Sequence, residues 1–435
     1  MDTFDYKKKF FDFCDYKPHE GQLKLHYPKK KDARFTVAIC GRRWGKSVSA
    51  SQEAAIVVTQ PKKRVWVVAP TYDGSEKVFR EVWHKLVVEK QMPTTRASFK
   101  QQYIEFEWGS TIEGKSADKP DSLVGEGLDY LIIDECAKIK EKVWNMDLRP
   151  TLSDRKGKAL FITTPQGYNW IYDLYLRGFK DKMWESINSP SWENQYAYPD
   201  GEKDEDLLEA RRNMPIEVFE QEYGAKFCAL AGRVYPFDRD KDIGEFPYDP
   251  ALPTYCSIDF GYRMPSVLWF QTSIVDGKDH IYVIDEINHQ RNIKTDKLAQ
   301  MVKAKNYRVD KYFGDPAGKN VQSSTGLGDM EIFRKYGIRV HSVRDKISRK
   351  LETGITLVRS FIENAEGERF LHLDRRCIAL AEDLENYRFP EHVEGKQLKN
   401  EPIKDGLHDH GCDALRYFFL NRFPIRQNSI NFVSR

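Results

Sequence analysis

The stretch AICGRRWGKSVSA, residues 38–50, decides how the first half of the chain is interpreted. An apolar run, FTVAIC (35–40), leads into a turn with two glycines, and a helical pattern begins at Lys46-Ser47. A phosphate-binding loop has a glycine, four further residues and then Gly-Lys-Ser/Thr. Gly45, Lys46 and Ser47 fit this pattern, but Cys40 stands where the first glycine is expected. The stretch therefore predicts a nucleotide-phosphate loop, and the alternative is a glycine turn with a solvated lysine.

Apolar runs around this loop predict an α/β sheet. Buried strands are expected at residues 35–40, 65–69, 130–133 and 159–163, with helical stretches between several of them. Near-continuous apolar runs are typical of parallel strands that are covered on both faces. A helix interrupted around Pro215 is expected over residues 205–223.

Length and composition predict two domains in an intracellular protein. The 435 residues exceed one ordinary core, and 40% apolar residues argue against global disorder. With 69 basic and 66 acidic residues, the charge balance neither requires nor excludes nucleic acid. The seven cysteines are scattered, which makes zinc or a disulfide framework improbable. The charged start MDTFDYKKKFFDF does not fit a signal peptide, and no run approaches the ~18 apolar residues of a membrane span.

A change in composition divides the chain. GRVYPFDRDKDIGEFPYDPALPTY carries four prolines and many charges, which is typical of a linker. The expected boundaries are therefore 1–230 for the first domain, 231–253 for the linker and 254–435 for the second domain. The second domain is expected to contain strands at 255–259, 266–274 and 280–284 with an Asp276-Gly277 turn, a helix near 294–305, a strand at 311–314 and a last helix at about 409–421.

The first domain supplies the other parts of an ATPase site. LDYLIIDECA places Asp134 and Glu135 at the exit of a strand, where open α/β sheets bind ligands. In this interpretation Ser47 and Asp134 bind Mg²⁺, Glu135 orients the attacking water, and Lys46 contacts the β- and γ-phosphates. The backbone amides of 42–47 hold the phosphates, and the expected nucleotide contacts in the loop are Gly41, Arg43, Trp44, Gly45, Lys46 and Ser47. Either Arg42 or Arg43 offsets developing charge.

Two hydroxyls end the next strand. In FITTP, Thr163 and Thr164 are placed where they could sense a γ-phosphate. The alternatives are an acidic strand-end turn for Asp134 and Glu135, and a plain strand terminator for Thr-Thr-Pro.

The second domain has its own acidic residues in distant segments. Asp259 ends a strand in SIDFG, Asp315 ends another in KYFGDPAG, and Asp413 lies in the last helix, HDHGCDALRY. Two-metal phosphodiester cleavage needs about three such carboxylates around two divalent ions. Oxygen ligands favour Mg²⁺ or Mn²⁺. A strand meander with a late acidic helix predicts a ribonuclease H-like domain.

Other charged residues are weighed as decoys. Asp285 and Glu286, in IYVIDEI, imitate the Asp134-Glu135 strand but follow no phosphate loop, so they are expected at the surface of a strand end. Lys346, Arg349 and Lys350 are candidates for a DNA groove or for ordinary surface charge.

These motifs, in this order, resemble the large terminase subunits of tailed bacteriophages. The deviant arginine-containing loop, IIDE and ITTP carry the resemblance, together with SLVGEGLDYLIIDEC, FEQEYGAKF, the DPAG-like turn and DALRY. KPHEGQLKLH looks like that family's adenine-contacting motif and implies that Gln22 contacts the base. ITTP then resembles the motif that couples hydrolysis to movement. The resemblance spans roughly residues 18–421.

The resemblance implies a function and partners. It implies an N-terminal P-loop ATPase domain of the ASCE type and a C-terminal ribonuclease H-like nuclease, which use ATP with Mg²⁺ and two Mg²⁺ or Mn²⁺ respectively. Such a protein translocates double-stranded DNA into a procapsid and cuts concatemeric DNA. Its implied partners are DNA, the portal ring and a small terminase subunit, as a homo-oligomeric ring on the procapsid that could be monomeric in isolation. No membrane is implied, and the place of action is the host cytoplasm at the portal. The rival functions are a repair helicase-nuclease and a nucleotide-gated DNA-binding scaffold.

The last helix offers competing metal ligands. Asp409 and Asp413 lie one turn apart on nearly the same helix face, so periodicity does not choose between them. Asp409 precedes the apolar run and is expected to be the N-cap, which makes it a poorer ligand. Asp413 lies inside the helix, and the family resemblance favours it, with His410 as a possible ligand of the second metal.

Overall fold

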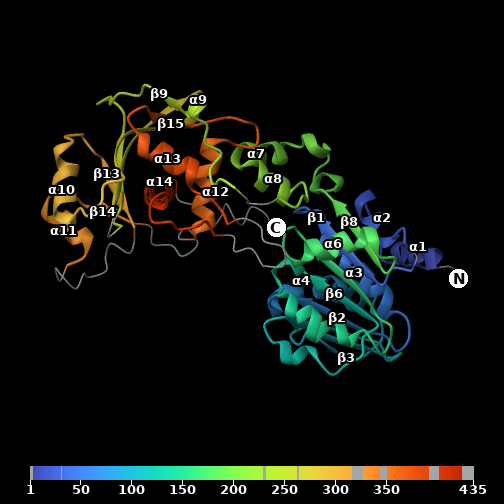
Figure 1. Cartoon of the computed structure of the whole chain (residues 1–435). Coiled ribbons are helices and arrows are strands. Elements are labelled where there is room, and N and C mark those ends of the chain that lie inside the picture. The colour runs from blue at the N-terminus through green and yellow to red at the C-terminus, as the bar shows by residue number, and fades with distance from the viewer. Residues whose placement is uncertain are drawn as a thin grey trace. The chain divides into compact units, whose positions relative to one another are not determined.

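The computed structural model describes residues 3–30, 32–228, 232–261, 264–315, 327–342, 350–390 and 401–423. The chain divides into two compact units, one of residues 1–209 with 217–229 and the other of 210–216 with 230–435. Figure 1 labels their elements. None of the described helices is long and apolar enough to cross a membrane.

The first unit is an eight-stranded sheet in the order β3-β4-β5-β2-β6-β7-β1-β8. In this sheet order, the six neighbouring strands β5, β2, β6, β7, β1 and β8 are parallel to one another. β4 and β3 extend the sheet beyond β5 as antiparallel strands. The strands are β1 (Phe35–Cys40), β2 (Arg64–Ala69), β3 (Thr94–Ser98), β4 (Tyr103–Phe106), β5 (Thr111–Ser116), β6 (Tyr130–Asp134), β7 (Lys158–Thr163) and β8 (Trp184–Ser189). The helices are α1 (Thr3–Phe13), α2 (Glu20–His26), α3 (Lys46–Val58), α4 (Tyr72–Val82), α5 (Arg149–Thr151), α6 (Trp170–Lys180), α7 (Glu205–Asn213), which reaches into the second unit, and α8 (Ile216–Glu222).

Both faces of this sheet are buried, as the apolar runs predict. Alternate residues of β1 enter two different cores: Ala38 and Cys40 pack with α3 and α4, whereas Val37 and Ile39 pack with α6 and the segment after β6. Because side chains alternate across a strand, a strand that is apolar at every position needs cover on both sides. The four strands expected from the sequence in this unit are confirmed within one residue. The antiparallel extension β3–β5 was not foreseen.

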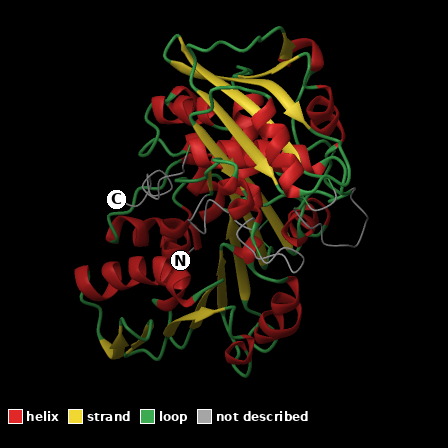
Figure 2. Cartoon of the chain, turned by 90° about the vertical axis from the view of Figure 1, so that its left-hand side faces the viewer, coloured by secondary structure: helices red, strands yellow, loops and turns green. Residues whose placement is uncertain are grey.

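The second unit is a seven-stranded sheet in the order β14-β13-β10-β11-β12-β15-β9. Its strands are β9 (Ile243–Gly244), β10 (Thr254–Asp259), β11 (Ser266–Val275), β12 (Lys278–Ile287), β13 (Lys311–Gly314), β14 (Val340–His341) and β15 (Leu371–Asp374). Figure 2 shows the strands of both units in yellow. Its helices are α9 (Arg239–Asp242), α10 (Thr295–Ala304), α11 (Asp329–Lys335), α12 (Leu351–Ile362), α13 (Ile378–Asn386) and α14 (Asp409–Arg422). α10 and α11 pack on one face, and α12, α13 and α14 on the other (Figure 1).

The expected hairpin forms between β11 and β12. Asp276 and Gly277 both have positive φ, 51° and 77°, which is the backbone of a tight two-residue hairpin turn. The expected meander, the helix near 294–305, the strand at 311–314 and the last helix all appear with boundaries close to those predicted.

The proline-rich segment differs from the linker expected over 231–253. Its described part belongs to the second unit, where β9 pairs with β15 and Val234, Tyr235 and Phe237 are buried. The prolines and charges suggested a linker, but these apolar side chains pack with α13 and α14 in the core. The main segment of the second compact unit begins at residue 230, before the proline-rich segment.

Candidate functional sites

The predicted phosphate loop joins β1 to α3 with the backbone that phosphate binding needs. Gly45 precedes the helix with φ 95°, and a Cβ there would lie 2.7 Å from the Gln22 side-chain nitrogen. Only glycine fits both the left-handed backbone and this close approach. α3 is 13 residues long, so its first amides and its dipole present positive charge at Lys46 and Ser47. The loop can therefore bind an anion.

α2 holds the loop from outside. The Gln22 side chain accepts a hydrogen bond from the His19 amide (3.1 Å) and donates one to the Gly45 carbonyl (3.3 Å). His19 Nε2 lies 2.7 Å from the Trp44 carbonyl oxygen, and the Trp44 indole, which is fully buried, donates to Ser189 Oγ (2.6 Å). Gln22 is thus placed against the loop, and Trp44 anchors the loop with its side chain. The contact of Gln22 with an adenine base stays a prediction.

Lys46 lies at the centre of the site. Its Nζ donates to the Gly41 carbonyl (2.8 Å) and to Thr164 Oγ1 (3.0 Å). Burial lowers the pKa of Lys46, against the opposing effect of the nearby acidic groups, among them Glu135 and Asp134. The ammonium group is therefore poorly hydrated and available to an anionic ligand at the same place.

The expected carboxylates lie at the same edge of the sheet. The register pairs Ile39 with Thr163 and Asp134 with Ile162, so β1, β7 and β6 end side by side. Neighbouring strands are ~4.8 Å apart. Lys46, Thr164 and Asp134 are therefore brought together from three segments by the strand order.

Asp134 and Glu135 have different surroundings. Burial, with the adjacent Glu135 charge, raises the pKa of Asp134 to about 6. Glu135 has φ 50°, a strained value for glutamate, and pairs with Lys138 at 2.9 Å. Burial tends to raise the pKa of Glu135, but Lys138 and the other lysines lower it overall. A buried carboxylate beside a second, ionised one suits a divalent cation next to a base for water.

The two arginines of the loop are held differently. Arg42 pairs with Glu222 at the end of α8. Burial lowers the pKa of Arg42, but the charge and the hydrogen bond of Glu222 raise it overall. The Arg43 carbonyl accepts a hydrogen bond from Asn194 (2.6 Å). Glu222 was not foreseen as a residue of this site, because nothing near the loop in sequence points to α8. Thr163 is buried and its hydroxyl donates to the Thr164 carbonyl (2.9 Å), so Thr164 is the threonine that faces Lys46.

The second site centres on Asp259, the last residue of β10. His410 Nδ1 lies 2.7 Å from Asp259 Oδ2, which joins the strand to the first turn of α14. Burial raises the pKa of Asp259 to about 6, and the charges of Asp413 and Asp315 add to this effect against the opposing His410 bond. Asp259 raises the pKa of His410, against the effect of burial. The pair can share one proton, and a divalent cation would displace it.

Asp413 and Asp315 converge on the same place. Burial and then the charges of Asp413, Asp259 and Asp315 raise the pKa of Tyr417, so the three carboxylates lie in the same region of the unit. The Asp413 carboxylate accepts hydrogen bonds from Arg416 (2.7 and 3.2 Å), and Lys404 Nζ lies 3.5 Å from it. Cationic side chains therefore neutralise Asp413.

The side chains of this site are of the kinds that bind a divalent cation, but they do not form a complete set of ligands. Within the described ranges, no three His, Cys, Asp or Glu side chains are arranged to hold one ion. Two buried hydroxyls on the Asp259 face, Ser257 Oγ and Ser266 Oγ, have no hydrogen-bond partner in the described part of the chain. Ser266 is paired with Asp259 across the strands, so hydroxyl groups without a hydrogen-bond partner lie next to this carboxylate. Residues 316–326, which include most of the DPAG turn, lie outside the described residues, as do Lys346 and Arg349.

Asp409 is not the N-cap. His408 occupies that position, and Asp409 is the first residue of α14. The Asp409 carboxylate accepts the Gly406 amide (2.8 Å), while Asp405 accepts the amides of Leu407 and His408. The helix therefore starts one residue earlier than an N-cap at Asp409 implies, and Asp405 orders the preceding turn.

Asp285 and Glu286 are not surface residues. Asp285 is buried and accepts hydrogen bonds from Lys305 (2.6 Å) and Tyr307 (2.9 Å). Glu286 accepts the Ala379 and Leu380 amides at the start of α13. Strand periodicity did not reveal these partners, since they come from helices and loops distant in sequence.

The comparisons with known proteins agree with the two sites. Residues 37–241 match the family described as terminase large subunit, T4likevirus-type, N-terminal. The chain is 29% identical over 398 residues to the terminase large subunit of Escherichia phage T5, covering 88% of this chain and 86% of that one. It is 36% identical over 257 residues to the terminase large subunit of Thermus phage G20c, covering about half (52%) of each.

A solved structure shows that the fold extends over both units. The large terminase of a thermophilic bacteriophage is superposed with a TM-score of 0.58 at 17% identity, covering 93% of this chain and 99% of that one. Both sites occur in one chain, and this chain is similar to phage terminase large subunits, to one of them over most of its length.

Proposed function

We propose that this chain is the motor and nuclease of viral genome packaging: it hydrolyses ATP to translocate double-stranded DNA into a procapsid and cuts concatemeric DNA. The observation that carries the proposal is one chain with two separate charged sites. One unit joins Lys46, Thr164 and Asp134 at a sheet edge, and the other gathers Asp259, His410 and Asp413.

In the ATPase unit, each residue has a task that its position supports. The amides of residues 42–47 cradle the phosphates, and Lys46 exchanges its Thr164 contact for a phosphate oxygen. Bound Mg²⁺, held by Ser47 and Asp134, would neutralise charge on the phosphates. Glu135, kept ionised beside Lys138, orients and deprotonates water. Gln22 contacts the base, and Gly41, Arg42, Arg43 and Trp44 shape the loop.

Thr163 and Thr164 connect this chemistry to movement. Thr164 is bonded to Lys46, so release of that bond on nucleotide binding frees the end of β7. Arg42 is paired with Glu222 of α8, which offers a second path from the loop. Either Arg42 or Arg43 can offset charge in the transition state once a nucleotide is present.

In the nuclease unit, Asp259, Asp315 and Asp413 would hold two Mg²⁺ or Mn²⁺ ions, with His410 as a further ligand. The bound ions would supply the activated water and stabilise the leaving oxygen of the phosphodiester. The protein's own contribution is to gather the carboxylates. A bound cation would take the place of Arg416 and Lys404 as the partner of Asp413.

The proposed partners follow from this activity. A motor that moves DNA of any sequence relies on phosphate contacts, so binding is expected to weaken steeply with salt. The protein acts with a portal ring and a small terminase subunit, as a homo-oligomeric ring on the procapsid in the host cytoplasm. The isolated chain can be a monomer.

The experiment separates the two chemistries in the full-length chain. Lys46→Ala or Glu135→Ala is expected to abolish ATP turnover and to leave Mn²⁺-dependent plasmid cleavage largely intact. Asp259→Asn is expected to do the reverse. A wild-type chain that cuts no plasmid with Mn²⁺ or Mg²⁺ would favour the DNA-binding scaffold, and strand separation by the chain would favour a helicase-nuclease.

A further inference from the structure

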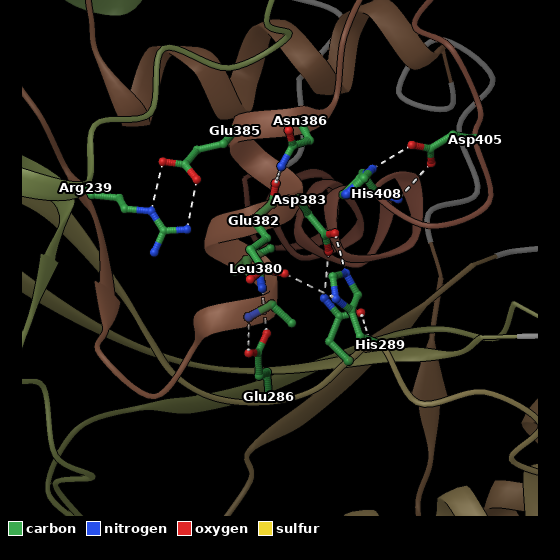
Figure 3. Close-up of polar contacts among 12 residues, drawn as sticks. Arg239, Glu286, His289, Leu380, Glu382, Asp383, Glu385, Asn386, Asp405 and His408 are labelled. Atoms are coloured by element: carbon green, nitrogen blue, oxygen red, sulfur yellow. Dashed lines mark hydrogen bonds and ion pairs between the residues drawn. The ribbon is translucent and has the colours of Figure 1, made fainter.

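Asp383, on α13, is a carboxylate without solvent exposure that neither proposed site uses. Its Oδ2 accepts a hydrogen bond from Asn288 Nδ2, and its Oδ1 lies beside His289 Nε2, both at 2.7 Å (Figure 3). Burial raises the pKa of Asp383 to about 6, against these two hydrogen bonds. A buried carboxylate is costly unless it is paired, so its place in the core calls for an explanation.

The two partners of Asp383 lie at the edge of the sheet that carries the nuclease site. Asn288 and His289 directly follow β12, and His289 has φ 54°, in the left-handed region. The register pairs Ile287 with Val267 on β11, and the neighbouring Ser266 with Asp259 on β10. The end of β12 is thus two strands from Asp259, or ~10 Å.

Asp383 also touches the helix that carries the proposed metal ligands. A Cβ on Gly411 would lie 2.0 Å from Asp383 Oδ2 and 2.7 Å from Asn288 Nδ2. The glycine therefore lets α14 approach the carboxylate more closely than any side chain would allow. Gly411 follows His410, which contacts Asp259, and precedes Asp413 by two residues.

α13 is itself anchored on both sides of Asp383. The Glu286 carboxylate accepts the Ala379 (2.8 Å) and Leu380 (2.9 Å) amides at one end. At the other end, Arg239 makes two hydrogen bonds to Glu385, at 2.9 and 2.8 Å (Figure 3). These bonds tie α13 to the end of β12 and to α9, in addition to its packing against α14 in the core.

We propose that Asp383 is a positioning residue of the nuclease site. Its carboxylate makes hydrogen bonds to the end of β12 and packs against the first turn of α14. It thereby fixes where His410 and Asp413 stand relative to Asp259. Asp383 acts through these residues and does not touch DNA, and the inference rests on the nuclease activity proposed above.

The test compares three variants of the full-length chain. Asp383→Asn keeps the shape, removes the charge and leaves one acceptor oxygen where Asn288 and His289 now have two. Gly411→Ala keeps Asp383 and adds the one methyl group that has no room. Glu245→Gln is the control, since it removes a surface carboxylate of the same unit, one that pairs with Arg375.

Three measurements are made on each variant. These are Mn²⁺ binding to the nucleotide-free protein by calorimetry, the Mn²⁺ concentration that gives half-maximal plasmid cleavage, and thermal unfolding. Loss of a residue that supports metal ligands costs about 10–100-fold in metal affinity or activity. Asp383→Asn and Gly411→Ala are expected to raise both the Mn²⁺ dissociation constant and the half-saturating Mn²⁺ at least about tenfold. Glu245→Gln is expected to leave both at the wild-type value.

The proposal is overturned if Asp383→Asn unfolds at a lower temperature but binds Mn²⁺ like the wild type. Where Asp383→Asn does not fold, Gly411→Ala decides: wild-type Mn²⁺ binding and half-saturation overturn the proposal, and a shift in both supports it. A wild-type chain without metal-dependent cleavage contradicts the nuclease function itself, whereas an active wild type with unchanged variants contradicts only this inference.

Discussion

At the scale of single residues, electrostatic surroundings distinguish groups of the same chemical type. Asp134 and Glu135 are adjacent, yet burial raises the pKa of the first and lysines lower that of the second. Asp409 and Asp413 are one turn apart, yet one accepts a backbone amide and the other pairs with Arg416. The partner of a carboxylate therefore indicates its task better than its position in the sequence.

The three candidates in the first turns of α14 are expected to respond differently to substitution. Asp413→Ala should eliminate cleavage, and His410→Ala should weaken it, since His410 is bonded to Asp259. Asp409→Ala should mainly lower stability, by about 1–3 kcal/mol, because it leaves the Gly406 amide without its acceptor. Plasmid cleavage with Mn²⁺ and chemical denaturation measure the two effects.

A structure with bound Mn²⁺ gives the decisive control for this assignment. Both ions on Asp409 and none on Asp413 would contradict it. Unchanged cleavage by Asp413→Ala, in a variant that unfolds like the wild type, would do the same.

At the scale of elements, buried carboxylates join strands to helices. Glu286 ends β12 and caps the start of α13 through the Ala379 and Leu380 amides. Burial nevertheless raises the pKa of Glu286 from its ordinary value of 4.5 to about 7. The Glu286 carboxyl of the folded chain therefore stays protonated over a pH range in which the same group of the unfolded chain is ionised.

This shift predicts the sign of a pH effect on stability. Because the folded-state pKa of Glu286 is the higher one, its protonation favours the folded state at low pH. That contribution is lost as pH rises from about 4.5 to 7, so stability falls through this window. Glu286→Gln carries no titrating group and is expected to flatten the fall. Urea unfolding at several pH values measures the difference between the variant and the wild type.

An exposed carboxylate supplies the control for this measurement. Glu245, which is paired with Arg375 at the surface, can be changed to Gln without altering the slope. An equal slope for Glu286→Gln and the wild type between pH 5 and 7 would show that Glu286 does not titrate as stated.

At the scale of the whole chain, the boundary between the two units predicts which fragments fold. Val234, Tyr235 and Phe237 are buried in the second unit, and β9 pairs with β15. A fragment of residues 230–435 is therefore expected to fold and to cut DNA with Mn²⁺. A fragment of 254–435 loses three large buried side chains, each worth about 1.5–3 kcal/mol, and is expected to be unstable.

Circular dichroism melting and plasmid cleavage of the two fragments test this boundary. Equal melting temperatures and equal activity would mean that residues 230–253 contribute nothing to the fold. Both fragments lack Lys46 and should hydrolyse no ATP.

The sequence alone determined the local features, namely the loops, turns and strand ends. The phosphate loop, the Asp134-Glu135 strand end, the Thr163-Thr164 strand end and the Asp276-Gly277 turn depend on neighbours within a few residues, so spacing and backbone preference reveal them. Their order along the chain was enough to indicate the resemblance to large terminase subunits. The same reasoning could not tell that Asp285 and Glu286 are held by Lys305 and α13, because those partners are distant in sequence.

Tertiary structure alone decided which of these groups meet. Strand order brings Thr164 to Lys46, packing of α14 on the sheet brings His410 to Asp259, and the absence of a side chain at Gly411 admits Asp383. It also decided that a proline-rich segment is part of a core rather than a linker. The physical reason is that such contacts depend on which faces are buried together, and burial is settled only when the whole domain packs.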